Sequence, residues 1–281
     1  MISYSQNFED VILWRALKEV QNGFYIDVGA NNPTRSTVTK WFYDNGWSGI
    51  NIEPNPFWFD LITSERPRDI NLQIAISDKL QEIDFYLLNA DALSTASLDI
   101  AASHVENGYK YDSIKVKADT LGHLLELYSK NEIHFLKIDI EGFEKIAIAS
   151  LNLEVFRPWI FCIEATKPMS LEETYSDWEK YLLSANYIFC YEDGLNRFYL
   201  SREKSHLVSR FALPPGIFDN FVKYQEPNDE ILLRMRDLEH ELLRMRDLEH
   251  ELLSIKNSKS WLLTKPLRRI MWIIQNFRYI N

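Results

Sequence analysis

Short runs of β-branched and aromatic residues alternate with helical patterns through about residue 200 of the chain. The strand-like runs are 24–28, 49–53, 71–75, 135–139 and 159–163. A succession of strand, helix and strand is typical of a parallel sheet that helices cover on both faces. The alternation therefore predicts an α/β fold, with extra strands or a hairpin at 82–88 and 114–117, before the fourth core strand.

The segments between the strand-like runs carry helical spacing. Apolar residues recur at helical positions over 8–20. Asp119 is placed to cap a helix over 120–130, and 171–185 form another helical segment. These helices would supply the two layers that cover the sheet.

Composition excludes several classes of protein. The chain has 281 residues, of which 46% are hydrophobic, so it can bury a core and is not expected to be disordered. Two cysteines, Cys162 and Cys190, are too few for a disulfide framework or a four-cysteine metal site. The first ten residues lack the pattern of a secretory signal, and no apolar run approaches the roughly 18 residues that cross a bilayer. We expect a cytoplasmic protein.

The pattern weakens after residue 210. Prolines and a glycine at 214–216, and Pro227 with Asn228, are typical of a linker. Residues 232–241 then recur as 242–251, an internal duplication. The chain is expected to divide into a domain over 1–210, a linker over 211–228, a repeat over 229–257 and a tail over 258–281.

The repeat carries a heptad seam. Its apolar positions follow steps of three and four residues, with one three-residue stammer. They are Ile231, Met235, Leu238, Leu242, Met245, Leu248, Leu252 and Ile255. We expect a coiled coil that makes the protein a homo-oligomer, and the alternative is a lone amphipathic helix that packs on its own domain.

Charge separates the tail from the body. The net charge is −10, yet residues 256–281 contain six basic residues and no acidic one. An acidic body repels nucleic acid, so no nucleic-acid partner is expected. The tail also contains tryptophans and aliphatic residues, a composition that binds anionic lipid surfaces. We expect a peripheral contact with the inner face of the cytoplasmic membrane, and an acidic partner protein is the alternative.

A single glycine ends the first core strand. The sequence Asp27-Val-Gly-Ala-Asn31 allows close approach of a ligand at Gly29. The further glycines of a dinucleotide site are missing, and so is a Gly-Lys-Ser/Thr loop for nucleoside triphosphates. The loop therefore lacks a phosphate cradle.

Two acids flank this loop. Asp27 precedes Gly29, and Glu53 ends the next strand, where a carboxylate can accept hydrogen bonds from a ribose diol. A nucleoside without phosphates but with an amino-acid portion fits this pattern, which predicts S-adenosylmethionine as the cofactor. Asp27 would act near its amino group, directly or through water. The alternative is that Asp27 caps the following helix and Glu53 is an ordinary loop acid.

A set of short motifs occurs in order and at sensible spacing from about residue 3 to 200. They are Tyr4-Ser-Gln6, Glu9-Asp10, Asp27-Val-Gly-Ala-Asn31, Ser36-Thr37, Gly46-Trp47, Glu53-Pro-Asn55, Ala75-Ile-Ser-Asp78 and Lys137-Ile-Asp-Ile-Glu-Gly-Phe-Glu144. With these motifs, this part of the chain resembles the FkbM-type methyltransferases. The resemblance implies a seven-stranded Rossmann-like class I methyltransferase fold and methyl transfer to oxygen, often on a sugar or polyketide-type hydroxyl.

The resemblance also assigns cofactor residues. Asp27, Gly29 and Asn31 match the cofactor loop, and Glu53 matches the ribose-binding acid. Ser77 and Asp78 fall at the end of the third strand, where such folds hold the adenine. Gln6 lies in a segment that would close over the cofactor.

Acids after the fourth and fifth strands are the candidates for catalysis. Because the carboxyl ends of parallel strands open onto the ligand crevice, Asp139 and Glu141 would face the transferring methyl group. Asp139 is the candidate base or substrate anchor, with Glu141 second. Glu164 would join Asp139 if a divalent cation is held there. The alternative is that Asp139 positions the cofactor and that Glu141 and Glu144 are structural.

The sequence thus predicts an S-adenosylmethionine-dependent O-methyltransferase that acts on a sugar hydroxyl. The start of the tail, 258–268, is similar to the closing segment of many bacterial polysaccharide-assembly enzymes, which suggests a surface glycan as the acceptor. One alternative is a non-catalytic scaffold of a glycan-assembly complex. Another is a dinucleotide-dependent oxidoreductase, which the missing glycines disfavour.

Overall fold

The computed structural model describes most of the chain in two units, Met1–Tyr224 and Gln225–Asn281. In the first unit it describes residues 1–88, 94–129 and 132–224. In the second it describes 225, 226, 244–246, 248, 253, 256, 261, 264, 266–268 and 270–272. The first unit contains all the predicted site residues.

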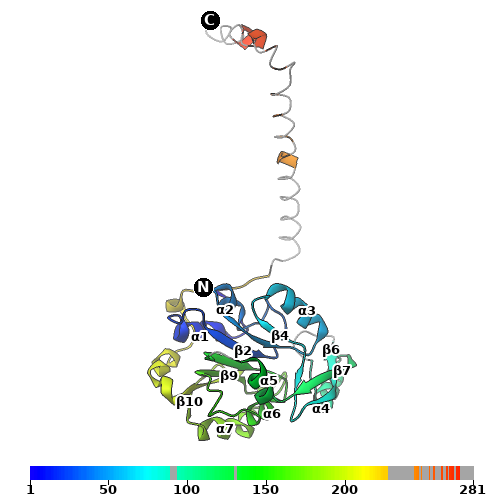
Figure 1. The fold of residues 1–281 in the computed structure, drawn as a ribbon, viewed down its shortest axis with the longest axis vertical. Helices are drawn as coiled ribbons and strands as arrows, with labels where there is room; N and C mark the ends of the chain where they lie inside the picture. Colours follow the sequence, from blue (N-terminus) through cyan, green and yellow to red (C-terminus); the bar gives the residue numbers. More distant parts are fainter. Residues whose placement is uncertain are drawn as a thin grey trace. The chain divides into compact units, whose positions relative to one another are not determined.

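A central sheet organises the first unit (Figure 1). Among the described residues it has seven strands in the order β10-β11-β9-β8-β2-β3-β4. Their bounds are β2 (Phe24–Val28), β3 (Ser48–Ile52), β4 (Ile70–Leu72), β8 (Phe135–Ile138), β9 (Ile160–Glu164), β10 (Tyr187–Glu192) and β11 (Asn196–Ser201). β11 is antiparallel to both neighbours, and the other pairs are parallel. The predicted α/β fold and its seven-stranded sheet are confirmed.

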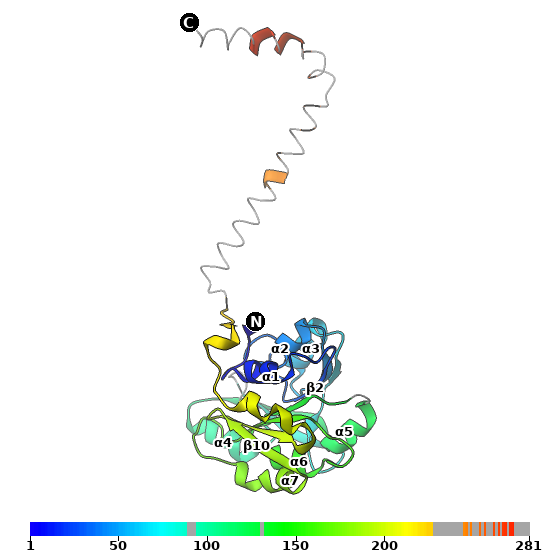
Figure 2. The same cartoon turned by 90° about the vertical axis from the view of Figure 1, so that its left-hand side faces the viewer.

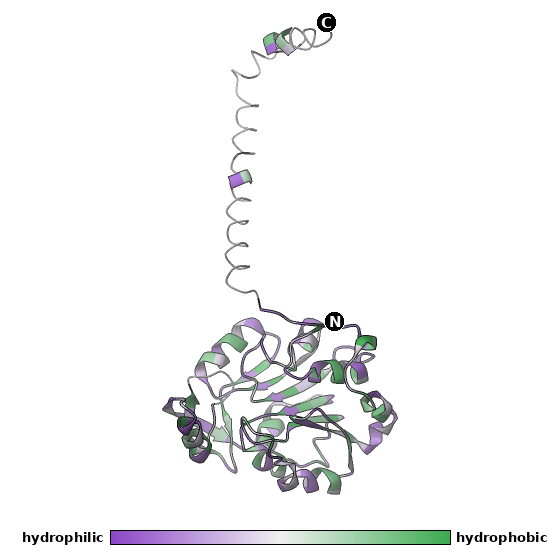
Figure 3. Cartoon of the chain, turned by 180° about the vertical axis from the view of Figure 1, so that it is seen from behind, coloured by the Kyte–Doolittle hydropathy of each residue, from purple (hydrophilic) through white to green (hydrophobic). Residues whose placement is uncertain are grey.

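Helices cover both faces of this sheet because successive strand residues point to opposite sides. Tyr25 of β2 packs with α1 (Glu9–Leu17) and α2 (Lys40–Asp44), in a cluster that includes Leu13 and Phe42. Ile26 faces the other layer, formed by α5 (Leu121–Tyr128), α6 (Glu144–Ala149) and α7 (Glu179–Ser184). Figure 2 shows these two helical layers on opposite sides, and Figure 3 shows the hydrophobic residues along the strands.

A second, smaller sheet begins at the third residue after β4. It has the order β5-β7-β6, and the elements in chain order are β5 (Ala75–Ile76), β6 (Gln81–Leu88), α4 (Leu98–Glu106) and β7 (Tyr111–Asp119). β6 and β7 are antiparallel. The extra strands predicted before the fourth core strand are therefore present, and they wall one side of the cavity described below.

Three sequence-based boundaries differ from the structure. The run 71–75 does not form one strand, because the chain leaves the central sheet after Leu72 and enters the smaller sheet at Ala75. The cap of α5 is Thr120, whose hydroxyl accepts a hydrogen bond from the amide of His123 at 3.1 Å. The segment 171–185 contains only a 3₁₀ turn and α7, because the backbone at Trp178 is not helical.

The first unit extends beyond residue 210, the predicted domain boundary. After the 3₁₀ segments η2 (Arg202–Phe211) and η3 (Ile217–Asp219), the short strand β12 (Val222–Lys223) pairs with β1 (Ile2–Ser3). Arg15 of α1 forms an ion pair with Asp219 at 2.7 Å. Much of the predicted linker is thus bound to the N-terminal segment, since backbone pairing and this ion pair hold it there.

Most of the predicted coiled coil over 229–257 and most of the tail lie outside the described residues. α3 (Pro56–Glu65), which follows β3, starts at an Asn55 cap that accepts the amide of Phe57. In the part of the chain that the structure describes, no helix has the length and apolarity that crossing a membrane requires.

Candidate functional site

A cavity of about 780 Å³ lies at the carboxyl edge of the central sheet. This edge is where parallel α/β sheets bind their ligands. Of the predicted site residues, those in its lining are Gln6, Gly29, Asn31, Glu53, Asp139, Glu141 and Glu164. A second cavity, of about 850 Å³, is lined by residues such as Arg157 and Glu203 and by none of the predicted site residues. The first cavity is the candidate site.

Gly29 ends β2 in a conformation that only glycine adopts without strain. Its φ is +79°, and a Cβ atom there would lie 1.9 Å from the backbone oxygen of Asp139. Its amide donates to Ile52 O at 3.0 Å, and its carbonyl accepts from Lys137 Nζ at 2.8 Å. The glycine loop is therefore packed tightly against both neighbouring strands.

Glu53 is fixed at the cavity wall by backbone amides. Its Oε2 accepts from the amide of Asn31, and its Oε1 accepts from the amide of Asn55, both at 2.8 Å. Asn31 has a φ of +50°, which turns its amide back toward β3. Burial raises the pKa of Glu53 to about 7, although these two amide bonds and Lys137 act in the opposite direction. Each carboxyl oxygen keeps acceptor capacity for one further donor.

Asp27 does not line the cavity. It is 1% exposed within β2, where its Oδ2 accepts from the Thr39 hydroxyl at 2.9 Å and its Oδ1 lies 3.4 Å from Lys137 Nζ. The same amine lies 3.3 Å from Asp139 Oδ2. Burial lowers the pKa of Lys137, but Asp139 and Asp27 together raise it above its ordinary value. Asp27 therefore acts behind the loop, by holding the lysine that binds the Gly29 carbonyl.

Ser77 and Asp78 also lie outside the cavity lining. The Ser77 hydroxyl donates to Lys79 O at 2.5 Å, and the exposed Asp78 accepts from Gln81 at 3.2 Å. Both residues follow β5, which belongs to the smaller sheet. Their prediction as adenine contacts is not supported, because the chain leaves the central sheet before it reaches them. Ile74 and Ile76 line the cavity there instead.

Gln6 is exposed and lines the cavity, and its contact with the cofactor stays a prediction. Its segment is fixed by Asp10, which accepts hydrogen bonds from the Ser3 and Ser5 hydroxyls and from the Tyr4 amide, each at 2.7 Å. Because Asp10 lies in α1, this network ties the Gln6 segment to the helix layer.

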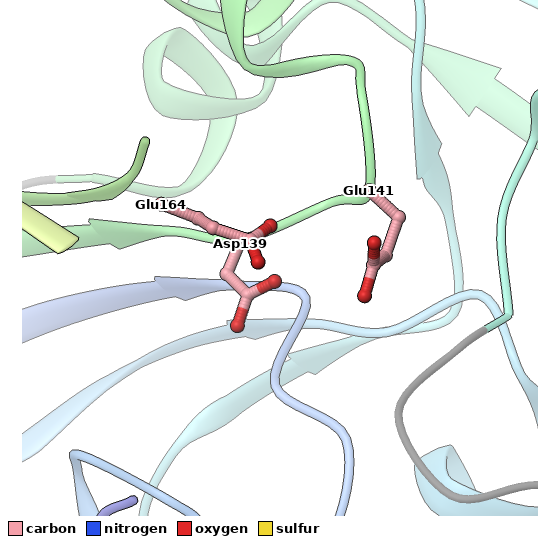
Figure 4. A group of neighbouring side chains, drawn as sticks. All are labelled: Asp139, Glu141 and Glu164. Carbon is pink, nitrogen blue, oxygen red and sulfur yellow. The ribbon is translucent and has the colours of Figure 1, made fainter. Parts of the chain in front are cut away.

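Three acids converge on one corner of the cavity (Figure 4). Asp139 directly follows β8, Glu164 is the last residue of the adjacent strand β9, and Glu141 lies on the loop after β8. One oxygen from each carboxyl group lies within 4.8 Å of the others. The structure thus brings together the two predicted catalytic acids and the acid predicted to share a cation with Asp139.

Burial and mutual repulsion change the acidity of these groups. Burial and then Asp139 and Glu144 raise the pKa of Glu141 well above its ordinary value. Burial and then Asp139, Glu141 and Glu144 do the same for Glu164. Such groups take up protons or cations, since adjacent carboxylates, two of which are buried here, repel one another when ionised.

The alternative structural role of Glu144 is confirmed. Its Oε1 accepts from the amides of Ile140 and Gly142, at 3.1 and 3.2 Å. It therefore holds the loop that carries Glu141.

Sequence reasoning missed several polar and aromatic residues of the cavity. They are Asn32, Arg35, Trp58, Ser94, Thr166 and Ser170. Thr166 follows β9 two residues after Glu164, so its position past a core strand was the available signal. Lys137, inside β8, could be recognised as a buried amine that needs a carboxylate, but of its two partners only Asp139 is near in sequence, and Asp27 is not.

Comparison with known proteins gives a family match. The model of the FkbM methyltransferase domain matches residues 27–189, more than half of the chain. A search of curated proteins finds no match.

Solved structures with a similar fold are distant in sequence. A TehB-like SAM-dependent methyltransferase from Corynebacterium glutamicum has 7% identity and a TM-score of 0.39, over 69% of this chain and 88% of that chain. A methyltransferase FkbM from Methylobacillus flagellatus has 13% identity and a TM-score of 0.40, over 64% of this chain and 43% of that chain.

TrmK of M. capricolum, solved in complex with S-adenosylhomocysteine, has 12% identity and a TM-score of 0.31, over 96% of this chain and 97% of that chain. These scores carry no weight for function, so the assignment depends on the family model. By that match, the chain belongs to the FkbM methyltransferase domain family.

Proposed function

We propose that this protein is an S-adenosylmethionine-dependent O-methyltransferase whose acceptor is a sugar hydroxyl of a bacterial surface glycan. The observation that carries the proposal is the position of Glu53. This acid is fixed by two backbone amides on the same cavity that holds Asp139 and Glu141. The proposed ribose-binding acid and the proposed proton acceptor thus line the same cavity.

The residues present fit the cofactor. The remaining acceptor capacity of Glu53 suits two adjacent hydroxyl donors. Beside Glu53, Gly29 and Ala30 present only backbone atoms and one methyl group to the cavity. Ile52, Ile74 and Ile76 give the cavity an apolar wall against which a planar base can pack. Bound S-adenosylmethionine supplies a methyl group on a positively charged sulfur.

Asp139 is the proposed base. Its side chain is 38% exposed to the cavity, while Lys137 lies 3.3 Å from its Oδ2. The acceptor hydroxyl oxygen would receive the methyl group, and Asp139 would orient the hydroxyl. The hydroxyl proton passes to the Asp139 carboxylate, so charge and atoms balance. Glu141 is the second candidate for this role.

The far wall of the cavity supports a hydroxylated acceptor. Thr166 and Ser170 offer hydroxyl groups there, and Met169 and Leu171 are 63% and 89% exposed beside them. Polar groups beside exposed apolar side chains suit a sugar, whose rings have both kinds of surface. The similarity of the tail to polysaccharide-assembly enzymes adds support for a glycan.

The test combines binding and turnover. Full-length protein is incubated with labelled methyl donor and fractionated cell glycans, and the labelled product is identified by mass analysis. Calorimetry with S-adenosylhomocysteine should show binding that Glu53→Gln weakens roughly tenfold or more and that Asp60→Asn, an exposed acid on α3, leaves unchanged. Cofactor binding without any labelled glycan would favour the scaffold alternative, and tighter binding of NAD would favour the oxidoreductase.

We propose that residues 229–257 make the protein a homo-oligomer. The heptad seam of the repeat supports this. Sedimentation should show an oligomer that reverts to a monomer when 229–281 are deleted. A monomeric full-length chain would contradict the proposal.

We also propose that the tail contacts anionic membrane. Its described residues include Trp272, 66% exposed, and Arg268, whose guanidinium lies 3.6 Å from the centre of the Trp261 ring. Flotation with anionic vesicles should be lost when Arg268 and Arg269 are neutralised. Flotation that is indifferent to this change would favour an acidic protein partner.

A further inference from the structure

The corner formed by Asp139, Glu141 and Glu164 contains an unsatisfied buried acid. Glu141 is 8% exposed, and its Oε2 has no hydrogen-bond partner among the described residues. Leaving a buried carboxylate oxygen unpartnered is costly, so native proteins usually supply a donor, a proton or a cation. The geometry of the neighbouring acids indicates which of these belongs here.

Nearby positive charge does not satisfy this corner. Lys137 donates to the Gly29 carbonyl and lies between Asp27 and Asp139, at 3.4 and 3.3 Å. Its charge is thus shared with an acid outside the corner. The largest electrostatic effects on Glu164 all come from other carboxyl groups. The corner therefore has an excess of negative charge.

The loop is built to hold Glu141 in this place. Its φ of +50° and that of +98° at Gly142 are left-handed. The Thr95 hydroxyl donates to the Glu141 carbonyl at 3.0 Å, and Glu144 binds the amides on either side. The strained backbone that carries Glu141 is therefore fixed by two residues, Thr95 and Glu144.

We propose that Asp139, Glu141 and Glu164 bind a hard divalent cation of the Mg²⁺ or Ca²⁺ class. All three offer carboxylate oxygens, the ligands that such ions prefer, and neither histidine nor cysteine belongs to the group. Oxygens on opposite sides of Ca²⁺ are about 4.6–5.2 Å apart, and on Mg²⁺ about 4.0–4.2 Å. The separations, each at most 4.8 Å, are compatible with three oxygens that share one ion of this class.

The cation would also define the acceptor site. The three acids line the cavity, so the coordination positions they leave open face the space for the acceptor. A hydroxyl oxygen bound there would have a lowered pKa and would lose its proton more readily to a carboxylate. This role rests on the proposed methyl transfer, whereas the binding of the cation does not.

Calorimetry with MnCl₂ on the full-length protein, without cofactor, tests the site. Wild-type protein should bind one Mn²⁺ per chain at this corner, and Glu141→Gln and Glu164→Gln should each weaken binding roughly tenfold or more. The matched control Glu173→Gln, an exposed acid outside the cavity lining, should bind as wild type. No binding at millimolar Mn²⁺, or equal binding by all variants, would overturn the proposal.

A measurement on the wild type guards against misfolded variants. A crystal soaked in MnCl₂ should give an anomalous peak between the three carboxyl groups, and a peak elsewhere or none would contradict the site. S-adenosylhomocysteine is titrated into the same protein. Binding of this nucleoside without Mn²⁺ binding would refute only the cation site, and Mn²⁺ binding without it would refute only the proposed cofactor.

Discussion

Glu53 and Glu141 are buried to a similar extent on one cavity, 5% and 8% exposed, yet their carboxyl groups are satisfied differently. Both oxygens of Glu53 accept backbone amides, whereas Oε2 of Glu141 has no hydrogen-bond partner in the described structure. Glu53 is held rigidly, and its carboxyl oxygens can still accept hydrogen bonds from neutral donors. Glu141 lies among other acids and needs a proton or a cation. The proposed ribose-binding acid and the proposed catalytic acid thus differ in how their carboxyl groups are satisfied.

The largest effect is expected at the loop that both acids depend on. Gly29→Ala places a Cβ 1.9 Å from Asp139 O at a φ of +79°, so it should lower the free energy of unfolding by roughly 2–4 kcal/mol. Chemical denaturation measures this. Gly194→Ala is the control, because its φ is +91° but no atom lies within 4 Å of the added Cβ. Equal losses for both variants would show that backbone strain alone matters.

Replacement of Glu53 and of Glu141 by glutamine should change the stability of the protein to different extents. Glu53→Gln sets an NH₂ group against a backbone amide and should cost about 1–3 kcal/mol of stability. Glu141→Gln should cost less than this, because Oε2 of Glu141 has no hydrogen-bond partner among the described residues that the replacement would lose. Denaturation in EDTA compares them. A comparable loss at Glu141 would contradict the view that its carboxylate is unsatisfied.

The pH dependence follows from the pKa of Glu53, which burial raises to about 7 from 4.5. The folded chain then binds more protons than the unfolded chain between these values, so stability from Glu53 is full below about pH 4.5 and is lost as pH rises through 7. A ribose diol prefers the ionised acceptor, so affinity for S-adenosylhomocysteine should rise up to about tenfold from pH 6 to 8. Calorimetry on Glu53→Gln, which should show no such rise, is the control.

The smallest effect is expected from the residues that lie off the cavity. Ser77→Ala and Asp78→Asn should change the affinity for S-adenosylhomocysteine by less than about twofold, because neither residue lines the cavity. A large loss at either position would restore the adenine contact that the sequence predicted.

The fold was largely predictable because strand and helix periodicities differ and each core strand is short and apolar. The run 24–28 became β2 without change, since both its faces are buried. The run 71–75 did not remain one strand, because pairing with β3 ends at Leu72 and pairing with β7 begins at Ala75. Such exchanges between sheets depend on long-range partners that local pattern does not contain.

The site was predictable where residues follow strand ends. Glu53, Asp139 and Glu141 reach the cavity because the parallel strands end at one edge. The role of Asp27 was not predictable, because its partner Lys137 is far away in sequence. Asp27 itself does not line the cavity. The chemistry of this part of the cavity depends on which strands lie side by side. Lys137 comes from β8, and Glu164 and Thr166 come from the end of β9.

The most direct test is a co-crystal structure of the full-length protein with S-adenosylhomocysteine. The predicted result is density in the cavity of about 780 Å³, with both ribose hydroxyls within hydrogen-bonding distance of the Glu53 carboxyl group. Density for the compound elsewhere, or a cavity closed by its own side chains at saturating compound, would contradict the central claim.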